Sequence, residues 1–282
     1  MNPNDMNADI SVTAASGKSG RRVVAALRAA GHPVRAASRS AQVRFDWEDA
    51  RTWPAVVQGA RAVYLVAPED SAPLPAFVDL VHDAGVKRVV LLSGRGRGRD
   101  TWNGRFGHAM AAAEDVVRAS GLSWTILAAN NFMQNFTEEL WHAPLLAGRL
   151  GLPTGGVPEP FVDLDDVAAV AARLLVADDH AGRTLELTGP TAITFADAVA
   201  TIAAAAGRPI RFDDITPADY AADLRSAGLT QEWITELNGL FEVMREGRIA
   251  APATGVEDVL GRPPRSFAAW VAHIAPTGAW AA

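Results

Sequence analysis

The chain has 282 residues, of which 49% are hydrophobic and 21% are charged, and its formal net charge is −6. This balance is typical of a globular protein with a buried core, and the acidic surplus disfavours binding to the phosphate backbone of nucleic acid. The absence of cysteine excludes disulfides, thiolate catalysis and cysteine-ligated metal sites.

The sequence contains no stretch that approaches the roughly 18 consecutive apolar residues of a membrane span. Residues 1–9 are polar and lack a basic segment followed by an apolar one, so they do not form a signal peptide. We therefore expect a cytoplasmic protein with no membrane contact and a disordered segment at residues 1–9.

Short apolar runs alternate with helical patterns in the first half of the chain, which predicts a parallel sheet with crossover helices. Strands are expected at 10–13, 33–38, 43–45, 62–67, 87–93 and 124–128, with helices at 20–30, around 77–85 and at 108–120. Later segments predict helices at 166–176 and 195–206, a strand at 185–187, and two or three helices between 217 and 274. The fold class predicted is α/β, a Rossmann-type doubly wound parallel sheet. Its nucleotide-binding core spans 10–150, and 151–282 completes the sheet and forms a small, mainly helical substrate lobe within one structural unit.

The turn after the first expected strand reads Thr13-Ala14-Ala15-Ser16-Gly17-Lys18-Ser19-Gly20. The dehydrogenase pattern Gly-x-x-Gly-x-x-Gly falls here on Ala14, Gly17 and Gly20. Glycines in this pattern permit a tight turn and let backbone N–H groups approach a pyrophosphate. A phosphate-binding P-loop is excluded because it needs glycine where Val12 stands. The pattern predicts a dinucleotide site, and the alternative is an ordinary strand-to-helix turn.

The end of the second expected strand carries Arg35, Ser38, Arg39 and Ser40 but no acid. Enzymes that use NAD usually place Asp or Glu there to bind the ribose hydroxyls. The guanidinium of Arg39 could instead bind a 2′-phosphate with two parallel hydrogen bonds. This favours NADP(H) over NAD(H) as the cofactor; the alternative for Arg39 is a solvated loop cation.

The Tyr-x-x-x-Lys pair of standard short-chain reductases is absent. The tyrosines are Tyr64 and Tyr220, and the residues four places further on are Pro68 and Leu224. Reduction of a ketone needs a proton donor for the developing alkoxide, so the sequence favours an acceptor that is already electrophilic, such as an iminium, quinone or enone.

Two residues are candidates for catalysis. His108, at the start of a helix, can act as an acid or base near neutral pH, or it is a loop histidine without a role. Asn131, with its neighbour Asn130, either binds a substrate carbonyl or ties down the end of a strand.

Other polar and aromatic groups are open to two interpretations. Asp163, Asp165 and Asp166 precede a helix and are better explained as N-terminal caps than as catalytic carboxylates. The histidine spacing predicts no metal site. The glycine- and arginine-rich segment 95–105 is either a lid over an anionic ligand or a solvated loop. An apolar substrate pocket or ordinary core packing accounts for Trp141, Trp233, Phe241 and Met244.

Several motifs in order along the chain carry a resemblance to a known family. They are the glycine turn, Phe45-Asp46-Trp47, Ala62-Val63-Tyr64-Leu65-Val66-Ala67-Pro68, Gly85-Val86-Lys87-Arg88-Val89-Val90-Leu91-Leu92-Ser93, Ser120-Gly121-Leu122-Ser123-Trp124-Thr125-Ile126-Leu127, Asn131-Phe132-Met133-Gln134-Asn135-Phe136, Pro160-Phe161-Val162-Asp163-Leu164-Asp165-Asp166, Leu187-Thr188-Gly189-Pro190 and Gly261-Arg262-Pro263-Pro264-Arg265-Ser266-Phe267. Together they resemble the NmrA-like family of atypical short-chain dehydrogenases/reductases, in particular its bacterial NAD(P)-binding, ergot-alkaloid-biosynthesis-like members.

The resemblance implies a cofactor site along the carboxyl edge of the sheet. By resemblance, the pyrophosphate is held by Gly17, Lys18, Ser19 and Gly20, and Ala14 and Ser16 of the same turn also belong to the cofactor site. The adenosine phosphate is held by Arg39, and Asp46 and Trp47 lie by the adenine. The middle of the cofactor lies along Ala67 and Pro68, and Ser93 with residues 131–133 approaches the nicotinamide. The sequence departs from the family at Ala14, at Ala128-Ala129 where many relatives carry Arg-Pro, and at Gly94-Arg95.

The expected function is therefore an NADP(H)-dependent oxidoreductase that transfers a hydride to an activated acceptor in a small, apolar, aromatic or polycyclic metabolite. Two alternatives stay open: a non-redox cyclase or isomerase of specialised metabolism on the same scaffold, and an NADP(H)-sensing regulatory protein. The expected partner is a small molecule, with no nucleic acid and no metal, and the sequence is compatible with a homo-oligomer.

Overall fold

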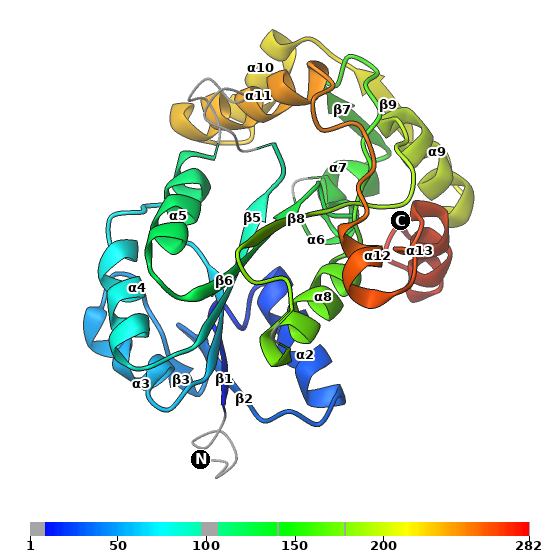
Figure 1. Ribbon diagram of the computed structural model, residues 1–282. Coiled ribbons are helices and arrows are strands. Elements are labelled where there is room, and N and C mark those ends of the chain that lie inside the picture. Colours follow the sequence, from blue (N-terminus) through cyan, green and yellow to red (C-terminus); the bar gives the residue numbers. More distant parts are fainter. Residues whose placement is uncertain (1–8, 97–106, 140, 178, 282) are drawn as a thin grey trace.

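The computed structural model describes residues 9–96, 107–139, 141–177 and 179–281 (Figure 1). Of the segment predicted to be disordered, residues 1–8 lie outside this described part.

A parallel seven-stranded sheet forms the centre of the molecule. Its strands are β1 (Ile10–Val12), β2 (Val34–Ser38), β3 (Val43–Arg44), β4 (Ala62–Val66), β5 (Arg88–Gly94), β6 (Ser123–Ala129) and β8 (Arg183–Leu187). They lie in the order β3-β2-β1-β4-β5-β6-β8, and every neighbouring pair is parallel. The direction of winding reverses between β1 and β4, which is where open α/β sheets bind their ligands. The predicted Rossmann-type doubly wound fold is confirmed.

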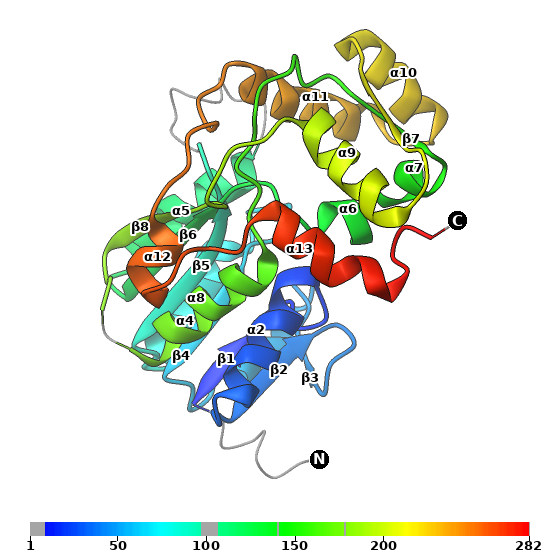
Figure 2. The same ribbon diagram turned by 90° about the vertical axis from the view of Figure 1, so that its right-hand side faces the viewer.

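Helices cover both faces of the sheet (Figures 1 and 2). One face carries α2 (Lys18–Ala29), α8 (Leu164–Val176) and α12 (Gly255–Leu260), and the other carries α3 (Pro54–Val57), α4 (Leu74–Asp83) and α5 (His108–Ala119). Side chains alternate between the faces along each strand, so Val89 and Leu91 pack under one layer and Val90 under the other. Burial on both faces explains the continuous apolar run of β5.

A second layer of structure lies over the carboxyl end of the sheet, at the end away from the N-terminus in Figure 1. It contains α6 (Asn135–Glu138), α7 (His142–Leu146), α9 (Phe195–Ala206), α10 (Pro217–Ser226), α11 (Gln231–Arg245), α13 (Phe267–Ile274) and a two-stranded parallel sheet of β7 (Arg149–Leu152) and β9 (Arg211–Asp214). Two short 3₁₀ turns complete the elements: η1 (Ala50–Thr52) precedes α3, and η2 (Ala275–Thr277) follows α13. The core of the second layer is aromatic: the ring of Phe136 lies 5.3 Å from the rings of both Phe161 and Phe267. We call this layer the C-terminal lobe.

The structure contains elements that the sequence did not predict. Both strands of the small sheet were missed, because β7 is four residues long with a glycine inside it and β9 is mostly charged. Between residues 217 and 274 there are four helices, where two or three were expected. The division at residue 150 stays a prediction, and this residue lies inside β7.

Candidate cofactor groove and substrate pocket

The carboxyl ends of the parallel strands bring most of the predicted site residues to one edge of the sheet. The glycine turn follows β1, Arg39 follows β2, Ala67 follows β4, and Asn131 follows β6. This placement follows from the topology alone, because parallel strands all end at the same edge.

Helix α2 begins directly at the glycine turn. Its N-cap residue Gly17 makes no side-chain cap, and its first turn contains no acid. By contrast, α8, α9, α10, α11 and α13 each have a capping Asp, Thr or Ser whose oxygen accepts from a backbone N–H of the first turn. The first N–H groups of a helix have no intrahelical acceptor, and together with the helix dipole they favour an anion. The N-terminus of α2 is therefore suited to bind a phosphate.

The geometry of the turn depends on its glycines. A Cβ at Gly20 would lie 2.2 Å from the carbonyl oxygen of Ala14, and one at Gly17 would lie 3.1 Å from the same atom. The first position of the pattern also has a left-handed backbone, with φ 49° at Ala14. An L-residue with a Cβ is strained there by about 1–2 kcal/mol. Ala14 therefore adopts a backbone conformation that favours glycine, and this conformation is strained for alanine.

A groove with a volume of about 1010 Å³ runs along this edge of the sheet. Its lining includes the predicted cofactor residues Ala14, Ser16, Gly17, Arg39, Asp46, Trp47, Ala67 and Pro68. The ring of Trp47 packs edge-on against those of Phe45 and Phe77, at 4.8 and 5.0 Å. This aromatic wall offers an apolar surface for a base, while the turn at the other side offers amides for phosphate.

The other predicted cofactor residues do not line the groove. Ser19 is buried and Gly20 packs against the turn itself. Lys18 extends toward α6: its Nζ donates to Oδ1 of Asn135 at 2.7 Å and pairs with Glu139 at 3.3 Å. Burial lowers the pKa of the Lys18 ammonium, and the Glu139 carboxylate opposes this effect. Lys18 thus joins the turn to the C-terminal lobe.

The Ser93 side chain is directed to the helix layer. Its hydroxyl donates to Oε1 of Glu114 on α5 at 2.6 Å, and Glu114 also pairs with Arg118 at 2.7 Å. The predicted approach of Ser93 to the nicotinamide stays a prediction.

His108 is the exposed first residue of α5 and lines neither the groove nor the pocket described below. Of the predicted lid at 95–105, residues 97–105 lie outside the described part of the chain. Arg95 itself is buried: it pairs with Glu186 at 2.9 Å and donates to the carbonyl oxygen of Ile249 at 2.8 Å. For Arg95 the lid interpretation is wrong, because its guanidinium fastens the C-terminal segment to β8.

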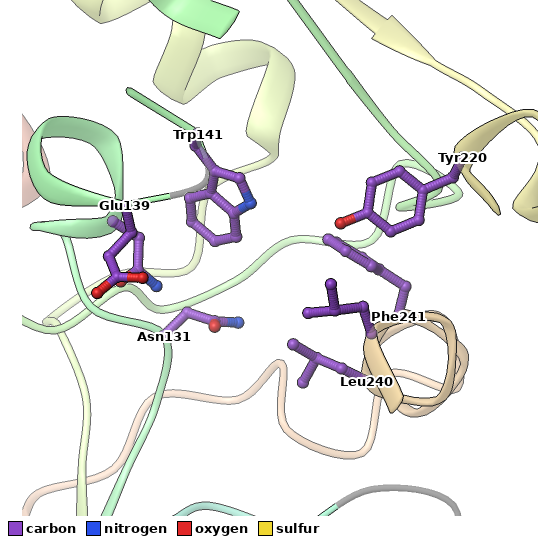
Figure 3. A pocket seen from close by; sticks show the side chains of 8 residues that line it. Asn131, Glu139, Trp141, Tyr220, Leu240 and Phe241 are labelled. Atoms are coloured by element: carbon purple, nitrogen blue, oxygen red, sulfur yellow. The ribbon is translucent and has the colours of Figure 1, made fainter. Parts of the chain in front are cut away.

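A smaller pocket lies between the carboxyl end of β6 and the C-terminal lobe (Figure 3). Its volume is about 100 Å³, and its lining is Asn131, Asn135, Glu139, Trp141, Tyr220, Leu237, Leu240 and Phe241. It contains the catalytic candidate Asn131. Of the four apolar residues suggested for a substrate pocket, Trp141 and Phe241 line it. Trp233 is 42% exposed and does not belong to it, whereas the Sδ of Met244 lies 3.5 Å from Nδ2 of Asn131.

A buried carboxyl group lies behind the pocket. Both Asn130 and Asn131 donate from Nδ2 to Oε1 of Glu159, at 2.7 and 2.9 Å, and Glu159 is 1% exposed. Burial raises the pKa of Glu159 to about 7, although hydrogen bonds from the side chain and the backbone of Asn131 and the charge of Arg95 lower it. The two asparagines therefore tie down the strand end, and Asn131 also faces the pocket. Sequence reasoning missed Glu159; the available signal was an acid between two prolines, Pro158 and Pro160.

The aspartates at the start of α8 are structural. Asp163 is the N-cap and accepts from the backbone N–H of Asp165, as predicted. Its carboxylate also pairs with Arg265 at 2.6 Å, and Asp166 pairs with Arg262 at 2.8 Å, so this cluster anchors the C-terminal segment. Arg35 is the second residue of β2 rather than part of its carboxyl end, and it is buried and donates to the carbonyl oxygen of Val56 at 3.0 Å. Within the described residues no group of three or more His, Cys, Asp or Glu could hold a metal ion.

The fold and the groove define a Rossmann-type dinucleotide-binding protein. A family described as NAD(P)H-binding matches residues 14–178. The NAD(P)H azoreductase of Xenophilus azovorans is 30% identical over 288 residues, covering 96% of this chain and 99% of the relative. The (4-alkanoyl-5-oxo-2,5-dihydrofuran-3-yl)methyl phosphate reductase of Streptomyces griseus is 30% identical over 282 residues, covering 94% and 97%. The triphenylmethane reductase of a Citrobacter species, solved with NADP(H), has a TM-score of 0.77 at 17% identity, covering 95% of this chain and 99% of that one.

The chain belongs to the NAD(P)H-binding, NmrA-like branch of the atypical short-chain dehydrogenases/reductases, a family that includes NAD(P)H-dependent reductases. The groove fits this cofactor, because an uncapped helix N-terminus, a glycine turn with no room for a Cβ at Gly20, and an aromatic wall follow one another along it.

No helix in the described ranges is long and apolar enough to cross a membrane.

Proposed function

We propose that this protein is an NADP(H)-dependent reductase that delivers a hydride to an activated acceptor bound in the pocket beside Asn131. The observation that carries the proposal is the connection between the two cavities. Lys18 starts the helix at the glycine turn, and its side chain reaches Asn135 and Glu139, which both line the pocket. A dinucleotide bound at the turn would therefore lie next to the pocket.

The preference for NADP(H) rests on Arg39. Its exposed side chain lines the groove just after β2, where no acid stands within the strand end to bind the ribose hydroxyls. A guanidinium binds a phosphate with two parallel hydrogen bonds, and such charge-assisted bonds are among the stronger ones in proteins. Two acids, Asp46 and Glu48, also line the groove, and the Asp46 carboxylate lies 3.7 Å from the Arg44 guanidinium, which offsets its charge.

When bound, the reduced nicotinamide supplies a hydride, that is, one proton with two electrons. The residues of this chain bind and orient the reactants. The α2 N-terminus holds the diphosphate, Trp47 and its aromatic neighbours provide the apolar surface for the adenine, and the pocket walls Trp141, Leu240 and Phe241 exclude water around the acceptor.

The acceptor class follows from what the described chain contains and from its relatives. The residues four places after Tyr64 and Tyr220 are Pro68 and Leu224, so the sequence contains no Tyr-x-x-x-Lys pair. The relatives' names describe reduction of azo groups and of an unsaturated ring that bears carbonyl groups. These are acceptors that are already electrophilic. The pocket volume of about 100 Å³ is below the roughly 300–1,000 Å³ of pockets that enclose drug-sized ligands. A single ring fits it, and a polycyclic acceptor would need the C-terminal lobe to move outward.

The proposal is tested by following NADPH absorbance with purified protein and a panel of small quinones, enones, iminium salts and azo compounds. Oxidation of NADPH that requires both protein and acceptor supports it. Two other results contradict it: NADPH binding without turnover of any acceptor indicates a sensing protein, and conversion of a compound without cofactor indicates a non-redox enzyme.

A further inference from the structure

Tyr220 is held in place at the wall of the substrate pocket. It lies in the first turn of α10, where the Thr216 hydroxyl accepts from the backbone N–H of Asp219 and Pro217 begins the helix. Its ring meets that of Phe241 edge-on, with centroids 5.2 Å apart and planes at 84°, and the residue is only 5% exposed. The hydroxyl points into the cavity, across from Asn131 and Trp141 (Figure 3).

This hydroxyl has no hydrogen-bond partner within the part of the chain that the structure describes. The hydroxyl is not among the buried side-chain atoms that lack a partner, so it is open to solvent in the cavity. A ligand that fills the cavity displaces this solvent, so the pocket is suited to a ligand that supplies an acceptor atom. The burial also raises the pKa of the Tyr220 hydroxyl, which keeps it protonated as a donor at physiological pH.

The other polar groups of the pocket are partly engaged by the protein. The Nδ2 of Asn131 donates to Glu159, and Oδ1 of Asn135 accepts from Lys18. The carboxylate of Glu139 is paired with the Lys18 ammonium at 3.3 Å, which offsets its negative charge. The nitrogen of the Trp141 indole is also turned to the cavity (Figure 3). Amide and indole N–H groups can donate a hydrogen bond but do not release a proton in the physiological range, whereas the Tyr220 hydroxyl can do both.

The possible acceptors differ in their need for a proton donor. Addition of a hydride to an iminium gives a neutral amine, so no proton is required. Addition of a hydride to the β-carbon of an enone moves the C=C electron pair toward the carbonyl and places the negative charge on oxygen. A quinone likewise becomes a hydroquinone anion. In both cases the product oxygen must take up one proton.

We propose that Tyr220 is the proton donor of this reductase and that the acceptor is a small conjugated carbonyl compound, an enone or a quinone. The inference rests on the proposed hydride transfer. The Tyr220 Oη–H bond breaks, its proton forms a bond with the oxyanion, and the phenolate takes a proton from water to restore the enzyme. The reduced pyridine dinucleotide is oxidised and the acceptor gains two electrons.

The first experiment measures binding without cofactor, so it does not depend on turnover. The full chain is titrated with para-nitrophenolate, a stable oxyanion, and with nitrobenzene, which lacks the oxyanion. Because a hydrogen bond to a charged group contributes about 1.5–3 kcal/mol, Tyr220→Phe should weaken nitrophenolate binding by about ten- to a hundred-fold and leave nitrobenzene within about two-fold. As a matched control, Leu240→Ala alters an apolar wall without removing a polar group and should weaken both probes alike.

Equal effects of Tyr220→Phe on both probes, or none on either, overturn the inference, as does the absence of nitrophenolate binding to the wild type. A failure of NADPH to bind would contradict the proposed function but would leave this result interpretable.

The second experiment compares turnover of cyclohexenone and of N-methyl-2,3,4,5-tetrahydropyridinium, an iminium of the same ring size, with NADPH. General acids contribute about 10²- to 10⁴-fold, so Tyr220→Phe should lower kcat for the enone by at least about a hundred-fold while turnover of the iminium changes less than about two-fold. Equal losses on both acceptors would show a structural role, and a wild type that reduces only the iminium would overturn the acceptor class.

Discussion

The cofactor groove and the substrate pocket are built in different ways. The phosphate end of the groove is formed by the backbone of one turn after β1, which occupies a few consecutive residues, and residues that follow β2, β3 and β4 complete the lining. The pocket is formed by side chains from β6, α6, α7, α10 and α11, which are far apart in the chain. A binding site that depends on backbone amides tolerates few substitutions in its turn, whereas a pocket of side chains can change its chemistry at single positions. The predictions below test this difference.

The largest effect is expected in the turn. Gly20→Ala forces a Cβ against the Ala14 carbonyl, where only 2.2 Å is available, and should displace the first amides of α2. We expect the variant to lose two hydrogen bonds from backbone amides to the charged phosphate, which would raise the Kd for NADPH by at least about a hundred-fold. Calorimetric titration measures this Kd. Gly85→Ala is the control: it has φ 77° and open space, so it should lower stability by about 1 kcal/mol without changing NADPH binding. A similar loss of binding in both variants would show that general destabilisation is responsible.

The pocket side of the comparison is tested by the titration of Glu159. Its pKa is raised from 4.5 to about 7 in the folded protein, so between these values the unfolded chain releases a proton that the folded chain keeps. The wild type should therefore lose about 3 kcal/mol of stability as pH rises from about 4.5 to about 7, and no more above that range. Glu159→Gln keeps the acceptor for Asn130 and Asn131 but cannot ionise. Urea unfolding at several pH values measures the free energy of unfolding of both proteins. The difference between the two free energies should change between about pH 4.5 and about pH 7; a difference that stays constant would contradict the raised pKa of Glu159.

Arg39 tests cofactor selectivity at the far end of the groove. Arg39→Ala should weaken NADPH binding by about ten- to a hundred-fold, the loss of a charged hydrogen bond, and leave NADH within about two-fold. Arg51→Ala removes the same charge from a side chain that is 91% exposed and paired with Asp49, and it should change neither. Equal effects of Arg39→Ala on NADPH and NADH would refute its role at the 2′-phosphate.

The smallest effect concerns the strained alanine. Ala14→Gly relieves about 1–2 kcal/mol of strain, because glycine adopts φ 49° without a Cβ clash, and costs about 0.4–1 kcal/mol through the more flexible unfolded chain, so the free energy of unfolding should rise by up to about 1 kcal/mol. Urea denaturation measures this change. If the variant is instead less stable by the roughly 0.4–1 kcal/mol that a more flexible unfolded chain costs, Ala14 is not strained in solution.

The sequence predicted the groove better than the pocket for a physical reason. Apolar strands that alternate with helices, and a glycine turn such as Gly17 to Gly20, are local patterns that determine backbone structure. By contrast, Asn131 and Tyr220 are 89 residues apart by their numbering, and only the folded C-terminal lobe brings them to one cavity. The same limit explains why Glu159 was missed, since its burial depends on the approach of Asn130 and Asn131 from β6. His108, chosen because imidazole titrates near neutral pH, lies outside both cavities.

Calorimetric titration of the purified wild type with NADPH and with NADH tests the central claim most directly. Binding of NADPH to one site per chain, at least about ten times tighter than NADH, is the result that the α2 N-terminus and Arg39 predict. No heat of binding with either dinucleotide would contradict the account of the groove and, with it, the proposed hydride transfer.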